Sequence, residues 1–337
     1  MFFRLGQKIF GFRIDGNDLS SYSIVLHSAS DVRAAPDVPH SVKKSAEILQ
    51  KYLFALTDLN VPISYDTYPL QTSRKILLGG TLCKNDDTYA KKYAEEEYEA
   101  YICNGDLVVN GGKRGILYGV YDFLEKAGLR FFTKNCERVL YRGETIEIDA
   151  FHTYFQPCFE YRELCDWNAW DSDFSVKCKL NGTFVRQLRR EDGGGVGFAG
   201  GFNGLVHTFS HLLPPDRYFS ENPDYYALNA QGIRDPSGLC LTNENVFQEV
   251  LKNARAWLEK EKDPSLLSVS VNDGDVAYCR CEKCRARLEG GENDTDLLLD
   301  FVNRVAAVLA EDYPKLCVDT ISYQHVAEMP QKIKPAD

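Results

Sequence analysis

The sequence has no block of lysine or arginine residues that could neutralise a phosphate backbone. Its 39 basic residues are outnumbered by 49 acidic residues, and the formal net charge is -10. We therefore expect no nucleic-acid partner. No run approaches the roughly 18 apolar residues of a membrane-spanning helix, so we expect no membrane partner either.

A secretory signal is also missing. Arg4, Gln7, Lys8 and Arg13 interrupt the apolar N-terminal residues, and no small-residue cleavage site follows. We therefore expect a cytoplasmic protein. What is present is an ordinary globular composition, 44% hydrophobic and 26% charged, in a chain of 337 residues that suits two domains.

Residues 1–150 predict a small α/β layer domain. Strands are expected at 22–27 and 75–80, and helices at 42–58 and 114–128, where apolar residues recur on one face. Residues 96–112 predict a hairpin that turns at Asn104-Gly105.

Residues 151–337 predict part of a (β/α)8 barrel of the TIM type. Expected strands at 159–164, 238–242, 266–272 and 316–324 alternate with amphipathic helices at 244–262 and 294–313. About five strand units fall between residues 159 and 324, whereas a complete barrel has eight. The sequence therefore predicts an incomplete, truncated barrel.

Several of these segments resemble known families. Residues 42–138, which include KILLGG and GILYGVYDFLEKAG, resemble the small α/β domain that precedes the barrel in β-N-acetylhexosaminidases and α-glucuronidases. The segments LVHTFSHLLPPDRYF, SVNDGDVAYCRCEKC and ISYQHV resemble the family catalogued as domain of unknown function 4838, some members of which are similar to endo-β-N-acetylglucosaminidases. The resemblance implies a glycoside hydrolase for glycans with β-linked N-acetylglucosamine, retaining by substrate assistance.

Asn272 and Asp273 follow the expected strand at 266–272, and barrel enzymes carry their reactive groups at such strand ends. The resemblance implies Asp273 as general acid and Asn272 as the residue that orients the 2-acetamido group of the substrate. The alternative is that Asn-Asp-Gly only forms the turn after the strand. Asp275 is a second candidate for the acid.

Five further side chains are candidates for glycan binding, and four of them also have a structural alternative. His207 could bond a hydroxyl or be a structural histidine, and Arg162 could clamp oxygen atoms or form a buried ion pair. Asn243 ends a strand but also suits the N-cap of the next helix. Trp167 could stack on a sugar or pack, and Tyr323 could line the cleft.

Cys279, Cys281 and Cys284 form a C-x-C-x-x-C pattern, in a chain with eleven cysteines. Three thiolates could share one structural zinc, whose fourth ligand would be Cys240 or a histidine. The alternative is that these thiols brace the loop by packing or oxidation. Catalysis requires no cofactor in this interpretation.

Two other functions stay open. An α-glucuronidase-like hydrolase would need a basic clamp, for which Arg162, Arg186 and Arg189 are available, and a non-catalytic carbohydrate-binding protein would need only the cleft. The glycine-rich run 193–204 does not follow a strand and open a helix, so we predict a mobile loop beside the cleft and no phosphate cradle.

Overall fold

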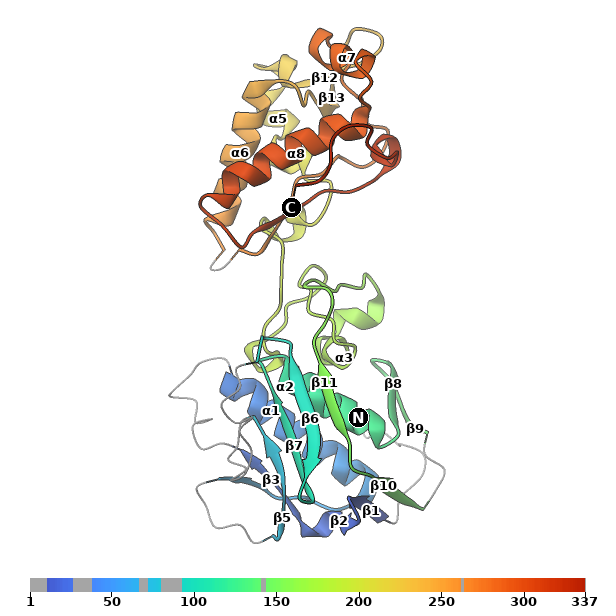
Figure 1. The fold of residues 1–337 in the computed structure, drawn as a ribbon. Coiled ribbons are helices and arrows are strands. Elements are labelled where there is room, and N and C mark those ends of the chain that lie inside the picture. The colour runs from blue at the N-terminus through green and yellow to red at the C-terminus, as the bar shows by residue number, and fades with distance from the viewer. Residues whose placement is uncertain are drawn as a thin grey trace. The chain divides into compact units, whose positions relative to one another are not determined.

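The computed structural model describes residues 11–26, 38–66, 72–79, 93–140, 144–261 and 264–336. They belong to two compact units, Met1–Val196 and Gly197–Asp337, and each unit is described by itself. Both units combine helices and strands, so the mixed α/β class predicted from the sequence is confirmed (Figure 1).

A six-stranded sheet in the order β11-β6-β7-β5-β3-β4 organises the first unit. The four strands β3, β4, β5 and β7 run parallel, and β6 and β11 are antiparallel to their neighbours. The strands are β3 (Tyr22–Leu26), β4 (Ile63–Tyr65), β5 (Arg74–Leu78), β6 (Tyr98–Cys103), β7 (Asp106–Gly111) and β11 (His152–Phe155).

Helices α1 (Val38–Thr57) and α2 (Gly115–Lys126) cover one face of this sheet (Figure 1). Because successive strand residues point to opposite faces, Ile24 faces the helices while Val25 belongs to a smaller apolar cluster apart from them. Both helices and the four predicted strands lie where the periodicity placed them.

The hairpin of β6 and β7 turns at Asn104-Gly105, as predicted. Both residues have positive φ, 52° and 80°, which an Asn-Gly pair tolerates. Two smaller sheets complete the unit: β1 (Gly11–Ile14), β2 (Asn17–Asp18) and β10 (Thr145–Ile148) form one, and β8 (Leu129–Thr133) and β9 (Cys136–Val139) form the other.

Residues 151–196 group with the first unit, whereas the sequence analysis assigned them to the second domain. Polar contacts hold them there: Arg162 pairs with Glu96, and the fully buried Asp192 pairs with Lys44 of α1. The predicted strand at 159–164 is wrong, because this segment bonds to the loop at Asn181 and forms no ladder. The one α-helix in this range is α3 (Ser172–Lys177).

The second unit contains two strand pairs. One is an antiparallel pair of β12 (Tyr226–Leu228) and β13 (Arg234–Leu239), and the other is a parallel pair of β14 (Leu266–Ser268) and β15 (Cys317–Asp319). The helices are α4 (Phe209–Leu212), α5 (Pro215–Tyr218), α6 (Glu244–Leu258), α7 (Glu282–Glu289) and α8 (Asp294–Ala310). A core of α6, α8 and β14 residues, among them Val250, Phe301 and Leu267, holds these elements together.

The strand predicted at 238–242 overlaps β13, but β13 pairs antiparallel with β12 and adds nothing to a parallel sheet. Residue Phe198 makes a parallel bridge to Leu266, so three parallel segments lie side by side, with β14 between residue 198 and β15. No closed barrel forms within the described residues.

Short 3-10 helices connect these elements: η1 (Leu19–Ser21), η4 (Trp167–Trp170), η5 (Arg190–Asp192), η6 (Gly201–Gly204), η7 (Pro223–Tyr225) and η8 (Gln324–Val326). The glycine-rich run 193–204 includes the point at which the two units divide.

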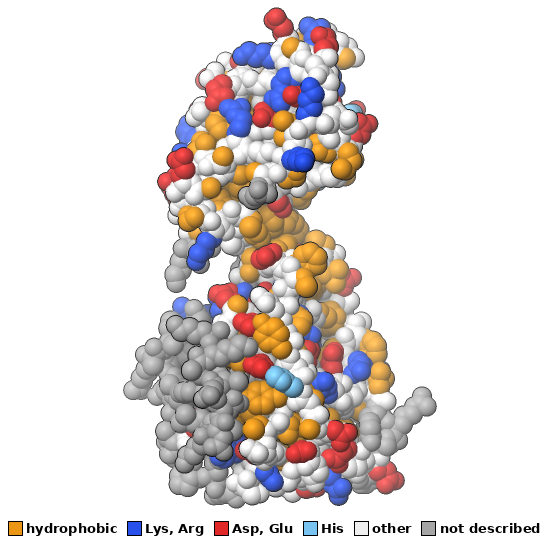
Figure 2. All heavy atoms as spheres, viewed as in Figure 1, with side chains coloured by type: hydrophobic (Ala, Val, Ile, Leu, Met, Phe, Trp, Pro, Cys, Tyr) orange, Lys and Arg blue, Asp and Glu red, His pale blue; other side chains and the backbone are white. Residues whose placement is uncertain are grey.

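The visible face of each unit carries interspersed acidic and basic side chains (Figure 2). No extended field of one sign gathers on that face. Among the helices in the described ranges, none combines the length and the apolar character that crossing a bilayer requires.

Candidate functional site

Three chain segments meet at the carboxyl end of the parallel pair in the second unit. The backbone N–H of Phe209 donates to the carbonyl of Ser270, and the N–H of Val269 donates to the carbonyl of Asp319. The buried Thr208 hydroxyl donates to the Ser268 carbonyl over 2.9 Å. The residues after each segment are therefore brought together at one edge.

Asp273, Tyr323 and His207 lie together at this edge. The Tyr323 hydroxyl donates to Asp273 Oδ1 over 2.9 Å, and the ring centroids of His207 and Tyr323 are 5.5 Å apart. The three residues come from three different segments, and the sequence analysis had singled out each of them.

His207 is held in an unusual backbone conformation. Its φ is +57°, a left-handed value that is uncommon outside glycine. Its Nδ1 lies 2.8 Å from the carbonyl of Val271 and must donate the hydrogen there, because a carbonyl only accepts. In the neutral ring Nε2 is then the acceptor, free to bond a hydroxyl group.

Asp273 is exposed and favours its ionised form. The Tyr323 hydroxyl, the Gly274 backbone N–H and the nearby His207 hold the pKa of Asp273 below its usual value. This environment suits an anion that stabilises positive charge; a general acid needs a raised pKa instead.

An open depression adjoins Asp273. It has a volume of about 510 Å³ and is lined by Gly274, Asp275, Gln324 and His325. Asp273 and Tyr323 directly precede these residues in the chain, although neither of the two lines the depression itself. The depression opens widely to solvent, so it is a shallow surface hollow and does not enclose a ligand as a deep pocket does.

The side chain of Asn272 forms hydrogen bonds to two other segments of the second unit. Its Oδ1 accepts from the Ser210 N–H, and its Nδ2 donates to the Ser237 carbonyl, both over 2.8 Å. One Nδ2 hydrogen is left for another acceptor. The side chain therefore has a structural role whatever it does with a substrate.

Asp319, at the end of β15, is a functional candidate that the sequence analysis missed. Asp319 is exposed as a whole residue, and partial desolvation of its carboxyl group by neighbouring atoms raises its pKa to about 6, against an opposing hydrogen bond with Ser268. A carboxyl with a pKa near 6 keeps its proton closer to neutrality, as a general acid must. The only hint in the sequence is an acid within the apolar run LCVDTI.

Arg162 and Trp167 belong to the first unit. Arg162 donates to both oxygens of Glu96, to Tyr118, and to the carbonyls of Phe159 and Lys179, so all five of its N–H groups have partners. This matches the structural alternative, an ion pair. Trp167 is 63% exposed and lies 4.7 Å from Trp170 between ring centroids.

Asn243 is the N-cap of α6. Its side chain accepts from the Asn245 N–H over 3.0 Å, and its Nδ2 donates to Asp224. An N-cap oxygen satisfies one of the free N–H groups of the first helical turn. Both polar groups of Asn243 are thus engaged in the fold.

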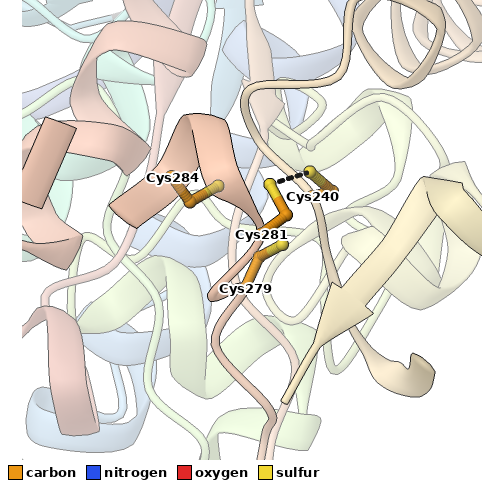
Figure 3. Close-up of side chains that lie close together, drawn as sticks. All are labelled: Cys240, Cys279, Cys281 and Cys284. Carbon is orange, nitrogen blue, oxygen red and sulfur yellow. Dashed lines mark hydrogen bonds between the residues drawn. The ribbon is translucent and has the colours of Figure 1, made fainter. Parts of the chain in front are cut away.

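Cys240 joins the three cysteines of the C-x-C-x-x-C pattern (Figure 3). The four sulfur atoms lie within 4.8 Å of one another, and Cys240 and Cys281 are 3.7 Å apart. The sequence analysis named Cys240 among the possible fourth members, and the fold brings it there from the end of β13.

The chain is an α/β protein with a polar site at the carboxyl end of a parallel strand pair. Residues 132–337 match the family described as domain of unknown function (DUF4838), and the chain belongs to this family. The family predicted from the resemblance is therefore confirmed. No curated protein matches the sequence at a significant level.

Solved structures of β-N-acetylhexosaminidases are similar to the chain at low identity. The enzyme from Bacteroides fragilis NCTC 9343 has 11% identity and a TM-score of 0.45, with 93% of this chain and 65% of that chain covered. A GH20 enzyme from Streptomyces coelicolor A3(2) has 12% identity and a TM-score of 0.40, with 93% and 63% covered. A GH20 exo-β-N-acetylglucosaminidase from Vibrio harveyi has 12% identity and a TM-score of 0.36, with 93% and 51% covered. The chain thus spans less than two thirds of each of these proteins.

Proposed function

We propose that the protein is a glycoside hydrolase for glycans that contain β-linked N-acetylglucosamine, and that it retains configuration by substrate assistance. The observation that carries the proposal is the group of Asp273, Tyr323 and His207 beside the depression of about 510 Å³. Carboxylate, hydroxyl and imidazole groups can bond sugar hydroxyls, and an aromatic ring can pack on the apolar face of a sugar. The resemblance of the surrounding segments supplies the substrate class.

The proposed chemistry has two steps. In the first step the acetamido carbonyl oxygen of the substrate bonds to C1, the glycosidic C1–O bond breaks, and Asp273 gives its proton to the leaving oxygen. In the second step water attacks C1, returns a proton to Asp273 and reopens the acetamido ring. The remaining Nδ2 hydrogen of Asn272 would orient the acetamido group.

Asp273 must gain a proton for this role. A sugar that takes over the Tyr323 hydroxyl and excludes water would remove the largest cause of its lowered pKa. Asp319 is the alternative proton donor, because desolvation already raises its pKa to about 6. In that version Asp273 would remain the anion that stabilises the developing positive charge.

The second unit is proposed to be part of a (β/α)8 barrel. Support comes from residue 198, β14 and β15, which lie side by side in parallel, and from α8, which crosses over between β14 and β15. Reactive groups after β14 and β15 would then lie at the catalytic face of the barrel.

An α-glucuronidase-like activity has less support. The arginines that could clamp a uronate are paired with carboxylates of the first unit: Arg162 with Glu96, Arg186 with Glu163, and Arg189 with Asp192. A binding protein without turnover remains the alternative that the lowered pKa of Asp273 favours.

Aryl glycosides test the proposal. We expect release of the aryl group from a β-N-acetylglucosaminide and not from a β- or α-glucuronide. Asp273→Asn should lower kcat/KM by at least about 100-fold, as loss of a general acid does. Asp312→Asn is the control, because Asp312 is an exposed acid of the same unit that pairs with Arg255 and does not line the depression, and this variant should retain activity.

Three outcomes oppose the proposal. Cleavage of the uronide alone would indicate the glucuronidase, and binding of N-acetylglucosamine oligomers without turnover would indicate the carbohydrate-binding protein. If Asp319→Asn abolishes cleavage while Asp273→Asn changes only KM, the proton comes from Asp319. Retention is checked by NMR of the anomer that forms first.

A further inference from the structure

Four cysteines that the proposed hydrolysis does not use form a closed group in the second unit. Cys240 follows β13, Cys279 lies in the loop before α7, Cys281 is the N-cap of α7, and Cys284 lies in its first turn. Three of the four are buried, and Cys281 is half-buried. Figure 3 shows the four side chains directed toward a common centre.

The sulfur distances fit the edges of a metal tetrahedron. With a Zn–S bond of about 2.3 Å, tetrahedral geometry separates the sulfur atoms by roughly 3.8 Å. Cys240 and Cys281 are 3.7 Å apart, and every pair lies within 4.8 Å. A disulfide would need about 2.05 Å, and all four cysteines are free thiols.

Neighbouring groups are arranged for thiolates. The Leu228 backbone N–H donates to the Cys279 sulfur over 3.4 Å, and the Thr242 hydroxyl lies 3.1 Å from the Cys284 sulfur. Donors of this kind orient metal ligands and stabilise their negative charge. Packing alone would not require polar groups directed at the sulfur atoms.

We propose that Cys240, Cys279, Cys281 and Cys284 bind one structural zinc ion. Four thiolates complete the tetrahedral coordination, so no position is open for water or substrate, and the ion is not catalytic. Binding converts the four thiols to thiolates and releases up to four protons to solvent. The site joins the end of β13 to the start of α7 and fixes the loop that follows Asp273.

Metal analysis of the whole chain tests this proposal. After purification in zinc-containing buffer and removal of any affinity tag, we expect about one zinc per chain by plasma mass spectrometry. Exchange with Co²⁺ should give the visible absorption of a tetrahedral four-thiolate complex. Chelation should lower the melting temperature, and added zinc should restore it.

Cysteine variants locate the ion. Loss of a residue that only supports a metal ligand lowers metal affinity by about 10–100-fold. Cys240 and Cys281 are proposed to be ligands themselves, so Cys240→Ala and Cys281→Ala should each lower the zinc affinity by at least that factor. Cys317→Ala is the matched control, since Cys317 is an exposed cysteine of the same unit, and it should retain zinc. If Cys240→Ala does not fold, the zinc content and the cobalt spectrum of the unaltered chain decide whether the four cysteines bind zinc.

Several results would overturn the proposal. They are a purified chain without metal in which Cys240, Cys279, Cys281 and Cys284 all react as free thiols, a chain that contains iron in place of zinc, and a Cys240→Ala protein with unchanged zinc content. None of these readouts depends on hydrolysis, so an inactive protein that contains zinc would contradict only the proposed function.

Discussion

The Tyr323 hydroxyl donates a 2.9 Å hydrogen bond to Asp273, and the two residues come from segments that only the fold brings together. This bond is the largest cause of the lowered pKa of Asp273. The tyrosine therefore controls how readily the carboxylate takes up a proton.

Tyr323→Phe should raise the pKa of Asp273 toward its ordinary value of 3.8, because the hydrogen bond to the ionised form is lost. The carboxyl carbon of Asp273, followed by NMR during an acid titration, reports this change. Tyr225→Phe, another tyrosine of the same unit, should leave the titration unchanged. An unaltered pKa in Tyr323→Phe would mean that the bond does not persist in solution.

Asp319 should make the protein less stable as the pH rises from about 4 to 6. Its pKa in the folded protein is about 6 against an ordinary value of 3.8, so the folded state holds the proton more tightly than the unfolded chain. The stabilisation is complete below the ordinary value and is lost as the pH rises through 6. Melting temperatures across this range should fall less in Asp319→Asn, and identical profiles would contradict the raised pKa.

Asp296 should stabilise the protein at higher pH, which is the opposite pH dependence to that of Asp319. Although burial alone would raise its pKa, backbone N–H groups of Asn293 and of residues 331–333 bond its carboxylate and lower the pKa to about 2. The shift from 3.8 corresponds to about 2 kcal/mol, present above about pH 4 and lost as the pH falls through 2.

Asp296→Asn should therefore lower the free energy of unfolding at pH 7 by about 2 kcal/mol, measured by denaturant titration. Asp300→Asn is the control on the same helix. Its partly exposed ion pair with Arg287 should contribute less than about 1 kcal/mol. Equal losses in the two variants would show that the buried bonds contribute no more than a surface ion pair.

Asn272→Ala should destabilise the protein by about 1–3 kcal/mol, because the Ser210 N–H and the Ser237 carbonyl lose their partner. Asn272→Asp should be destabilised as well, since a carboxylate would face the Ser237 carbonyl while still accepting from Ser210. Thermal unfolding measures both. If stability is unchanged while KM rises, the side chain acts on the substrate alone.

The sequence predicted the four longest helices and the strands β3, β5, β6 and β7 well, because their signals are local. Apolar spacing gave α1, α2, α6 and α8, and the Asn104-Gly105 pair gave the hairpin turn. Strand direction is not a local property: the segment at 238–242 has the apolar character of a barrel strand, yet its partner β12 makes it antiparallel.

The candidate site was predictable only in part. Asp273, His207 and Tyr323 follow apolar runs, and that position suggested them before their contacts were known. The raised pKa of Asp319 depends on how densely other segments surround its carboxyl group, which no spacing encodes. Cys240 lies far from the C-x-C-x-x-C pattern in the sequence, so only folding could select it over the histidines.

The ion pair of Arg162 with Glu96 limits where the protein chain can be truncated. The family match begins at residue 132, inside the first unit, so a piece cut there would contain Arg162 and Asp192 without Glu96 and Lys44. Arg162 would then lose its carboxylate partner, and Asp192 would keep Arg189 but lose Lys44. Removing one member of a buried ion pair costs several kcal/mol. We therefore expect residues 132–196 to be destabilised in a protein that starts at residue 132, and limited proteolysis should cut it within that range, ahead of the second unit.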